Sequence, residues 1–352
     1  MTLLSGACSG GSPPPGHSDD PVATATGEQV SCSSCALSFR RLSTFPQGDD
    51  DTLFGFRAQL VVLASGQAVV APVMPSGGIA RFDAAGHLDR VVGRSGGGPG
   101  ELGDVFSLAP SADSLLVAAR DRISLFSDEL LPIREAPVAT VYWVVRALGG
   151  GAFAASSVAP DRSPTLHILN PDLTLRRSFG VLPPDAPPER RPLAVDARAQ
   201  IWAAVPGQYA LEHWDASGTL LKTIGRSVRF FPAWTTRDAF SRNRYTQPPL
   251  PRVVDLYSAG SELWVLLEVA DADWKAEAAP AGEHNPVPSL AAVERRVDRL
   301  LEVLDAMSGA ARVSARLPMF AISFGAAGQL VSMREDSAGI RRFDEWAVTV
   351  KR

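Results

Sequence analysis

Residues 192–225 read PLAVDARAQIWAAVPGQYALEHWDASGTLLKTIG, and this stretch contains one complete structural unit. The apolar run PLAV precedes the turn DARAQ, and the apolar run IWAAV follows it. A third run ends at Asp215, and a fourth run ends at Gly225. Short apolar runs separated by turns that contain Gly or Asp are typical of antiparallel strands joined as hairpins. The unit therefore predicts four consecutive strands.

The same turn between two apolar runs occurs five more times along the chain. These turns lie at Ala64–Gln67, Ser111–Ser114, Leu148–Gly151, Ser258–Ser261 and Ala326–Gln329. The turn residues that follow the third strands recur at intervals of about 45 residues, at Asp83, Ser127, Asn170 and Asp215. A four-stranded unit with this period is the blade of a β-propeller. We therefore predict an all-β fold, a six-bladed β-propeller with four-stranded antiparallel blades.

The count of outer strands predicts how the ring closes. Six inner hairpins are present but only five outer strands follow them, so the last blade lacks one strand. Ala36–Phe45, ALSFRRLSTF, is a spare strand that precedes the first blade. We expect it to complete the last blade, because a closed ring has no open sheet edge.

The segment Gly93–Glu101, GRSGGGPGE, stands between the first two predicted blades. It looks like the G-x-G-x-G-P-G-E connection of bacterial six-bladed propellers related to NHL-repeat and TolB-like domains. Many members of that group are uncharacterised lipoproteins. The resemblance covers about residues 35–352 and implies the fold. It implies almost nothing about activity, because propellers host unrelated functions.

The first residues resemble a lipidation signal. Leu4–Cys8, LSGAC, is similar to a bacterial lipobox, and Cys8 is the predicted lipidation site. Residues 1–8 would then be the end of a truncated signal peptide, because seven residues cannot hold its basic and apolar regions. Residues 9–34 are rich in Ser, Pro, Gly and Thr and predict a flexible tether. The alternative is a cytoplasmic protein whose N-terminus is complete as given.

Cys32 and Cys35 form a single C-x-x-C pair. A zinc site would need further ligands at metal spacing, and haem attachment would need a His in place of Ala36. A redox role would need a thioredoxin-like context, which is lacking. A small disulfide in an oxidising compartment is the favoured interpretation.

Two insertions interrupt the blades, at residues 226–252 and 270–299. The first interleaves arginines with aromatic residues, which together can bind anions, sugars or peptides. The candidate ligand residues are Arg226, Arg229, Phe231, Trp234, Arg237, Arg244 and Tyr245. The alternative is that the aromatic side chains pack over the propeller and the arginines are solvated.

The second insertion predicts a short helix over residues 290–300, LAAVERRVDRL, capped by Ser289. Apolar residues at Leu290, Val293, Val297 and Leu300 define one helical face. That face would lie on the rim of the propeller or dock a partner.

No catalytic residue, cofactor site or metal site is predicted. The sequence lacks G-x-S-x-G and H-E-x-x-H motifs, and His167 and His213 are expected to point to opposite sheet faces. Gluconolactonase-like propellers, which resemble this fold, hold a divalent metal with Glu, Asn and Asp at the channel. Here only Glu101, Asp104 and Asp255 could approach the channel, and no Asn completes the set.

These observations favour a binding scaffold over an enzyme. The expected protein is an extracytoplasmic, membrane-anchored lipoprotein of the periplasm or outer membrane, which binds an envelope protein, a peptide or a glycan. Its only membrane contact would be the lipid anchor, and it is expected to be a monomer. Nucleic acid is disfavoured because the net charge is −4. The alternative function is a metal-dependent hydrolase or lactonase with its site at the central channel.

Overall fold

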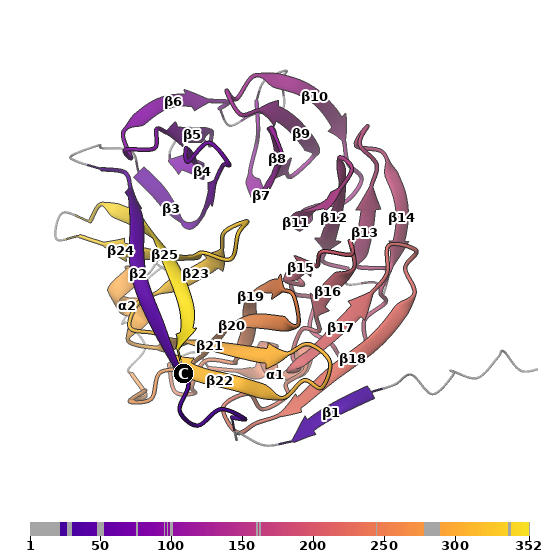
Figure 1. Cartoon of the computed structure of the whole chain (residues 1–352), viewed down its shortest axis with the longest axis vertical. Coiled ribbons are helices and arrows are strands. Elements are labelled where there is room, and N and C mark those ends of the chain that lie inside the picture. The colour runs from indigo at the N-terminus through magenta and orange to yellow at the C-terminus, as the bar shows by residue number, and fades with distance from the viewer. Residues whose placement is uncertain are drawn as a thin grey trace, which may run out of the picture.

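Six small antiparallel sheets are arranged in a ring around a central axis (Figure 1). The computed structural model describes residues 22–26, 30–47, 53–74, 77–94, 96, 98, 101–159, 161, 163–243, 245–277, 289–336 and 339–351. The predicted six-bladed propeller is therefore confirmed, with four strands of one blade in each sheet.

Each blade runs from the innermost strand to the outermost strand in chain order, except at the closure. Blades one to three consist of β3 (Leu53–Val62), β4 (Ala68–Met74), β5 (Ile79–Phe82), β6 (Leu88–Val92); β7 (Val105–Ser111), β8 (Ser114–Ala119), β9 (Arg122–Ser127), β10 (Pro132–Pro137); and β11 (Tyr142–Gly149), β12 (Ala152–Ser157), β13 (Leu166–Leu169), β14 (Leu175–Phe179). Blades four to six consist of β15 (Leu193–Val195), β16 (Ile201–Ala204), β17 (Ala210–Trp214), β18 (Leu220–Ser227); β19 (Arg252–Ala259), β20 (Glu262–Ala270), β21 (Val297–Asp305), β22 (Ala311–Arg316); and β23 (Ala321–Phe324), β24 (Leu330–Glu335), β25 (Arg341–Lys351), β2 (Ala36–Phe45).

The turns between third and fourth strands are built by the residues that mark the repeat. Asp83 Oδ1 accepts hydrogen bonds from the backbone N–H groups of Ala85 and His87, both at 2.9 Å. Asp215 Oδ1 accepts equivalent bonds in blade four. An aspartate side chain that binds the backbone two and four residues ahead stabilises a tight turn locally. The period of the sequence is thus the period of these turns.

The apolar core lies between neighbouring blades. One cluster joins blades four and five through Trp202, Leu211 and Leu263, among others. Another joins blades six and one, where the rings of Phe54 and Phe343 meet edge to face at 5.4 Å. Since each sheet is apolar on both faces, every blade is stabilised by the two blades beside it.

Strand β2 closes the ring as the outermost strand of blade six, as the sequence predicts. It pairs antiparallel with β25, from Ala36 opposite Lys351 to Phe45 opposite Phe343. Phe45 is 1% exposed and packs 6.2 Å from the ring of Phe82 in blade one. The N-terminal part of the chain therefore holds its C-terminal strand in place.

The segment before β2 is more ordered than the tether prediction for residues 9–34 implies. Strand β1 (Val22–Thr26) pairs in parallel with β18, at the outer edge of blade four. Ser31 then donates its N–H to the carbonyl of Ala311 in blade five, at 2.8 Å. The reason is that the outer strand of blade four offers an unpaired edge that a chain segment can cover. Residues 1–21, which include the predicted lipidation site Cys8, lie outside the described residues.

Cys32 and Cys35 form the predicted disulfide, with an S–S distance of 1.97 Å. The bridge encloses a tight turn in which Cys35 N–H donates to the Cys32 carbonyl at 3.3 Å. It stands directly before β2, so it restrains the entry to the closing strand.

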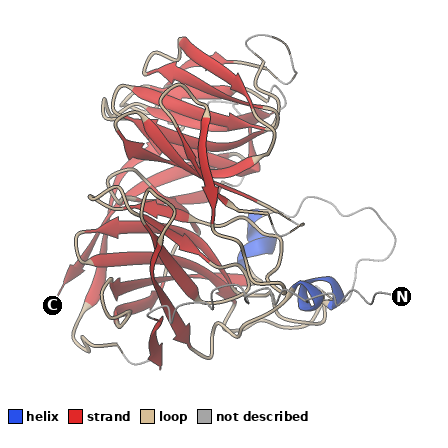
Figure 2. Ribbon diagram, turned by 90° about the vertical axis from the view of Figure 1, so that its right-hand side faces the viewer, coloured by secondary structure: helices blue, strands red, loops and turns tan. Residues whose placement is uncertain are grey.

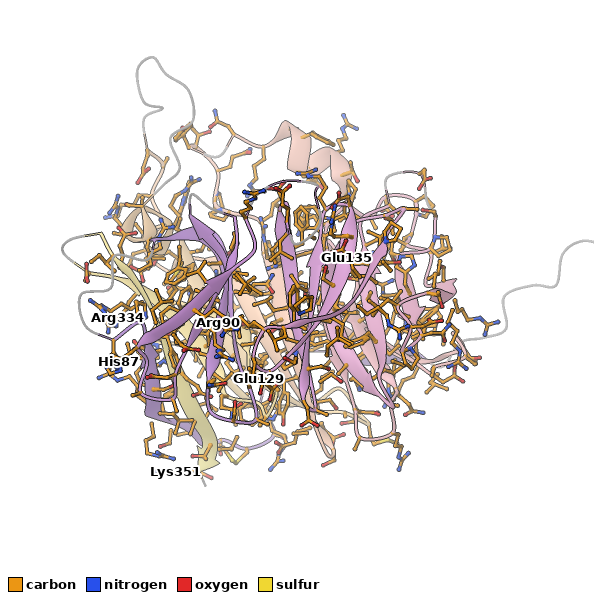
Figure 3. All side chains as sticks on the ribbon, turned by 90° about the horizontal axis from the view of Figure 1, so that it is seen from above. His87, Arg90, Glu129, Glu135, Arg334 and Lys351 are labelled. Atoms are coloured by element: carbon orange, nitrogen blue, oxygen red, sulfur yellow. A yellow bond between two sulfur atoms is a disulfide. The ribbon has the colours of Figure 1, made fainter. Side chains whose placement is uncertain are left out.

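Arginines also join the outer parts of neighbouring blades. Arg90 of β6 donates to the carbonyl oxygen of Glu129 in blade two, at 2.9 Å, at the outside of the ring (Figure 3). Arg81 of β5 donates to the carbonyl of Asp128 beside it, at 2.8 Å. These bonds tie a strand of one blade to the turn of the next.

Both helices are short and lie on the same face of the ring (Figure 2). They are α1 (Thr236–Ser241) in the first insertion and α2 (Leu290–Glu294) in the second. No helix in the described ranges is long and apolar enough to cross a membrane.

The predicted helix over residues 290–300 is half the expected length. Ser289 caps α2 as predicted, because its Oγ accepts from the N–H of Ala292 at 3.2 Å. The helix ends at Glu294, however, and β21 begins at Val297. From there β21 pairs with β20 at nine successive positions. Pairing along a whole buried strand outweighs the weak helical preference of the sequence.

Candidate functional site

The two insertions enclose a cavity on the face of the ring that carries the helices. Its volume is about 650 Å³. The lining residues come from the connection into blade four, from both insertions and from the first residues of β19 and β21. They are Glu189, Trp234, Ala239, Arg242, Tyr245, Gln247, Pro249, Leu250, Arg252, Glu277, Ser289, Ala292, Val293, Arg295, Arg296 and Val297. A cavity of this size with an apolar lining and a few charged groups is typical of a ligand site.

Trp234 anchors the first insertion to the propeller. Its indole Nε1–H donates to the carbonyl of Pro251 at 2.8 Å, and its backbone N–H donates to Gly207 at 2.8 Å. The next residue, Thr235, begins α1 with a capping box in which Asp238 binds back to the cap. The buried indole and the cap hold α1 in a defined position, so the cavity wall is preformed.

Arg226 and Phe231 do not reach the cavity. Both are buried between blades four and five, where Phe231 stacks on Tyr209 at 5.2 Å. Arg226 Nε lies 3.2 Å from Glu302 Oε2, and its Nη1 donates to the carbonyl of Gly309 at 3.1 Å. Phe231 therefore packs inside the protein, whereas Arg226 is buried and paired with Glu302, which neither the prediction of a ligand residue nor the alternative of a solvated arginine anticipated.

Of the other predicted ligand residues that the structure describes, Trp234 and Tyr245 line the cavity. Arg229 and Arg237 are exposed and are not among the lining residues. Arg244 lies outside the described residues. Within the described residues, the cavity therefore lies beside the first insertion, but most of the residues predicted as ligands do not line it.

The second insertion supplies the opposite wall. The N–H of Glu277 donates to the carbonyl of Tyr245 at 2.8 Å, which joins the two insertions directly. Further along, Ala292 and Val293 of α2 and Val297 of β21 form its apolar part. Sequence reasoning missed this half of the site. The only local signal was the pair Arg295 and Arg296 at the end of α2, next to apolar residues.

The cavity is positively charged, since four arginines face two glutamates. Arg252 is partly neutralised, because its Nε lies 3.2 Å from Glu268 and its Nη1 lies 4.0 Å from Glu189. Arg242 donates from Nε to the carbonyl of Pro248 at 2.6 Å. The exposed Arg295 guanidinium makes no hydrogen bond or ion pair with any described residue. Arg295 is therefore available to an anionic ligand.

At the central channel, Asp255 joins three blades and does not stand free for a metal. Its Oδ1 accepts from Arg146 of blade three at 2.6 Å, and its Oδ2 accepts from the N–H of Phe324 of blade six at 2.8 Å. Both oxygens of this buried carboxylate are thus engaged.

The other carboxylates considered for a metal also have arginine partners. Glu101 pairs with Arg94 at 2.8 Å, and Asp104 pairs with Arg120 at 2.5 Å. Within the described ranges, no three His, Cys, Asp or Glu side chains are grouped to hold a metal ion. The metal-dependent alternative therefore has no ligand set in this part of the chain.

His167 and His213 are placed in separate environments. His213 stacks on Trp202 at 4.1 Å and lies 3.2 Å from Asp196. His167 is buried between Ser157 Oγ at 2.8 Å and Ser178 Oγ at 2.9 Å. Burial alone lowers the pKa of His167 from 6.5 to about 4. His167 is therefore neutral and structural at pH 7.

His167 makes the fold sensitive to acid. Because the unfolded chain binds a proton near pH 6.5 and the folded chain only near pH 4, this contribution to stability is complete above pH 6.5 and is lost as the pH falls to about 4. The loss should reach about 3 kcal/mol. Urea unfolding at pH 6.5 and at pH 4 should show this loss of stability in the wild type. The control His87→Gln should show it too, because the His87 side chain is exposed. His167→Gln should be less acid-sensitive by that amount; an unchanged difference would refute the assignment.

Comparison with known proteins extends the description of the fold only. No family model and no curated protein matches the chain. The crystal structure of a candidate exported protein from Bacteroides fragilis is similar over 94% of this chain and 100% of that chain, with 9% identity and a TM-score of 0.60. BamB from Moraxella catarrhalis is similar over 88% of this chain and 99% of that chain, with 10% identity and a TM-score of 0.47. At such identities, the similarity to the Bacteroides protein shows a shared propeller fold.

Proposed function

We propose that the protein is an extracytoplasmic binding scaffold, and that it binds an acidic, partly apolar peptide segment in the cavity between its two insertions. The observation that carries this proposal is the lining of the cavity. Four arginines stand around an aliphatic surface that includes Leu250, Val293 and Val297. Arginine binds carboxylates through two parallel hydrogen bonds, and the aliphatic surface would bury an apolar side chain of the same ligand.

A peptide fits this lining better than a glycan does. The faces of a sugar carry hydroxyl groups, and burying those against aliphatic side chains would leave their hydrogen bonds unmade. Trp234, the most suitable ring for stacking on a sugar, is 5% exposed and has its indole N–H already bonded to the backbone. A protein partner would bind through one segment of suitable sequence.

The disulfide supports the proposed location. A Cys32–Cys35 bridge persists in oxidising compartments such as the periplasm or the cell surface. We further propose lipidation at Cys8, which lies beyond β1 on the N-terminal side. Metabolic labelling with a fatty acid should then mark the wild type and leave Cys8→Ala unlabelled. Equal labelling of both would exclude Cys8 as the anchor.

A bulky side chain introduced into the cavity tests whether the ligand binds there. Ala292 of α2 lines the cavity, whereas the neighbouring Ala291 is exposed and does not. The probes are decapeptides in which Leu alternates with Glu, Gln or Lys, and polygalacturonate serves as the acidic glycan. Ala292→Trp should weaken binding of the Leu–Glu peptide at least tenfold in calorimetry, because the indole occupies the ligand volume. Ala291→Trp should bind like the wild type.

Four outcomes would contradict the proposal. One is a wild type that binds none of the peptides, and a second is a preference for the Leu–Lys series over the Leu–Glu series. The third is tighter binding of polygalacturonate than of the Leu–Glu peptide, which would favour a glycan ligand. Equal binding by Ala292→Trp and Ala291→Trp would move the site away from the cavity.

A further inference from the structure

A second cavity, of about 540 Å³, lies at the outer part of blade six and shares no lining residue with the cavity between the insertions. Three arginines line it from three strands: Arg41 of β2, Arg334 of β24 and Arg342 of β25. The other described residues in its lining are uncharged: Leu42, Ser43, Thr44 and Gln47. We call this cavity the arginine pocket, and Figure 3 shows Arg334 at the outside of the ring.

Two of the arginines stand directly opposite each other on neighbouring strands. Arg334 of β24 is in register with Arg342 of β25. Like charges at directly opposed positions repel and destabilise a sheet. The next pair shows the favourable arrangement, because Glu335 is opposite Arg341 and the two side chains form an ion pair at 3.2 Å. The opposed arginines therefore carry a cost that a bound anion would relieve.

A bulge in the closing strand accompanies the third arginine. The pairing of β2 with β25 shifts between Arg41 and Ser43, so Leu42 has no opposite residue. A bulge of this kind bends a strand and redirects the side chains beside it. Arg41 lies 3.7 Å from the carboxylate of Asp344, which shares a face of β25 with Arg342. Three guanidinium groups are thereby gathered on one side of the sheet.

One buried carboxylate serves two of these arginines. Asp344 is 3% exposed, and its Oδ2 accepts from Arg334 Nε at 2.9 Å. Its Oδ1 accepts from Thr44 Oγ1 at 2.5 Å and lies 3.7 Å from Arg41 Nη1. Both oxygens are engaged, and one negative charge cannot neutralise two guanidinium groups.

Arg342 has a carboxylate partner of its own. Its Nε lies 3.4 Å from Asp336, and its Nη1 donates to the carbonyl of Pro46 at 2.9 Å. Within the described residues, two carboxylates thus lie within ion-pair distance of the three guanidinium groups. One positive charge of the pocket is left without a counter-charge of its own. The terminal nitrogens of Arg334, whose side chain is 44% exposed, make no hydrogen bond with a described residue.

A turn of blade one supports the pocket. The N–H of Gln47 donates to the carbonyl of Gly86 at 2.8 Å. Gly86 has a φ of +89°, and a Cβ there would stand 2.6 Å from the carbonyl oxygen of Thr44, so the turn packs directly against the wall of the pocket. Leu42 is the one aliphatic residue in the described lining. A polar anion therefore suits this pocket better than the partly apolar peptide proposed for the other cavity.

We infer that the arginine pocket binds a phosphate group, either free or carried by a sugar. A phosphate group has acceptor oxygens that point in several directions, so guanidinium groups from three strands can donate to it together. A carboxylate, whose two oxygens lie in one plane with its carbon, matches a single guanidinium better. The volume exceeds that of one phosphate ion, and the hydroxyl and amide groups of the lining suit the hydroxyls of a sugar.

The test titrates sodium phosphate, glucose 6-phosphate and sodium succinate separately into the full chain by calorimetry, at constant ionic strength. Arg334→Gln should weaken phosphate binding at least tenfold, and Arg334→Lys should weaken it less because the charge remains. Arg41→Gln should also weaken it at least tenfold. This second variant carries little risk to the fold, because the Arg41 side chain is 54% exposed and makes no hydrogen bond with a described residue.

Arg316→Gln is the matched control. Its side chain is likewise 44% exposed and paired with one carboxylate, that of Asp298, but it lines neither cavity. Arg316→Gln should therefore bind phosphate like the wild type.

The two phosphate probes distinguish the source of the group. Tighter binding of glucose 6-phosphate than of phosphate would assign the pocket to a phosphorylated sugar, and the reverse order would assign it to free phosphate. The inference would be overturned by a wild type that binds neither probe, or by one that binds succinate more tightly than both. Unchanged affinity in Arg334→Gln or Arg41→Gln, or an equal loss in Arg316→Gln, would also overturn it. None of these variants alters the cavity between the insertions, so the result is independent of the proposed function.

Discussion

A chain that begins at residue 47, and therefore lacks β2, is expected to lose its native fold. The deletion removes a ten-residue strand that pairs with β25 along its length. It also removes Phe45 from the core between blades six and one. An exposed edge on β25 would then invite pairing between molecules.

The expected result is aggregation or a broad, non-cooperative thermal transition, measured by size exclusion and circular dichroism. The matched control is a chain that begins at residue 30, which lacks β1 but keeps the disulfide and β2. It should elute like the full chain, without aggregates, and unfold cooperatively, because β1 only covers the edge of a blade that already has four strands. A chain beginning at residue 47 that stays free of aggregates and unfolds cooperatively would show that β2 is dispensable for closure.

Glu302→Ala is expected to be the most damaging single substitution, with a loss of about 3–5 kcal/mol in the free energy of unfolding. Glu302 is 1% exposed and accepts from the Tyr209 hydroxyl at 2.5 Å and from Arg226 Nη2 at 3.3 Å. Without it, the Arg226 charge stays buried between blades four and five with no counter-charge beside it. Guanidinium unfolding at pH 7 measures the difference.

Two variants show whether the loss of stability comes from the unpaired charge of Arg226. Asp104→Ala breaks an ion pair with Arg120 whose partners are both exposed, and it should cost about 1 kcal/mol or less. The triple variant Tyr209→Phe, Arg226→Met, Glu302→Leu removes every polar member of the buried group. It should recover most of the stability lost in Glu302→Ala, because no charge or hydroxyl remains unpaired. A Glu302→Ala effect no larger than that of Asp104→Ala would refute this account.

Most of the fold could be predicted from the sequence because it is built by local rules. The turns at Asp83 and Asp215 are closed by hydrogen bonds to residues two and four positions ahead. Such turns leave a readable pattern at fixed spacing, and the repeat then implies the ring. The closing role of Ala36–Phe45 followed from counting strands, since an unpaired edge is unfavourable.

The errors occurred where contacts distant in sequence decide the structure. The predicted helix over residues 290–300 has apolar residues at helical spacing, yet pairing with β20 makes its second half part of β21. Strand β1 has a composition that predicts a tether, and it becomes a strand only because the edge of β18 is beside it. In neither case does the local sequence contain the partner.

The candidate site depended most on the tertiary structure. The sequence by itself determined the blades, the turns and the position of the two insertions, because each of these follows from residues close together in the chain. It also determined the closing strand, because the number of predicted strands left one blade a strand short. Only the folded ring decided that Glu189, Arg252 and Arg296 line one cavity and that Arg226 is buried beside Glu302. The physical reason is that the connections into blades four and five and the loop between β20 and β21 meet on the same face of the ring, so residues with no shared local pattern meet there.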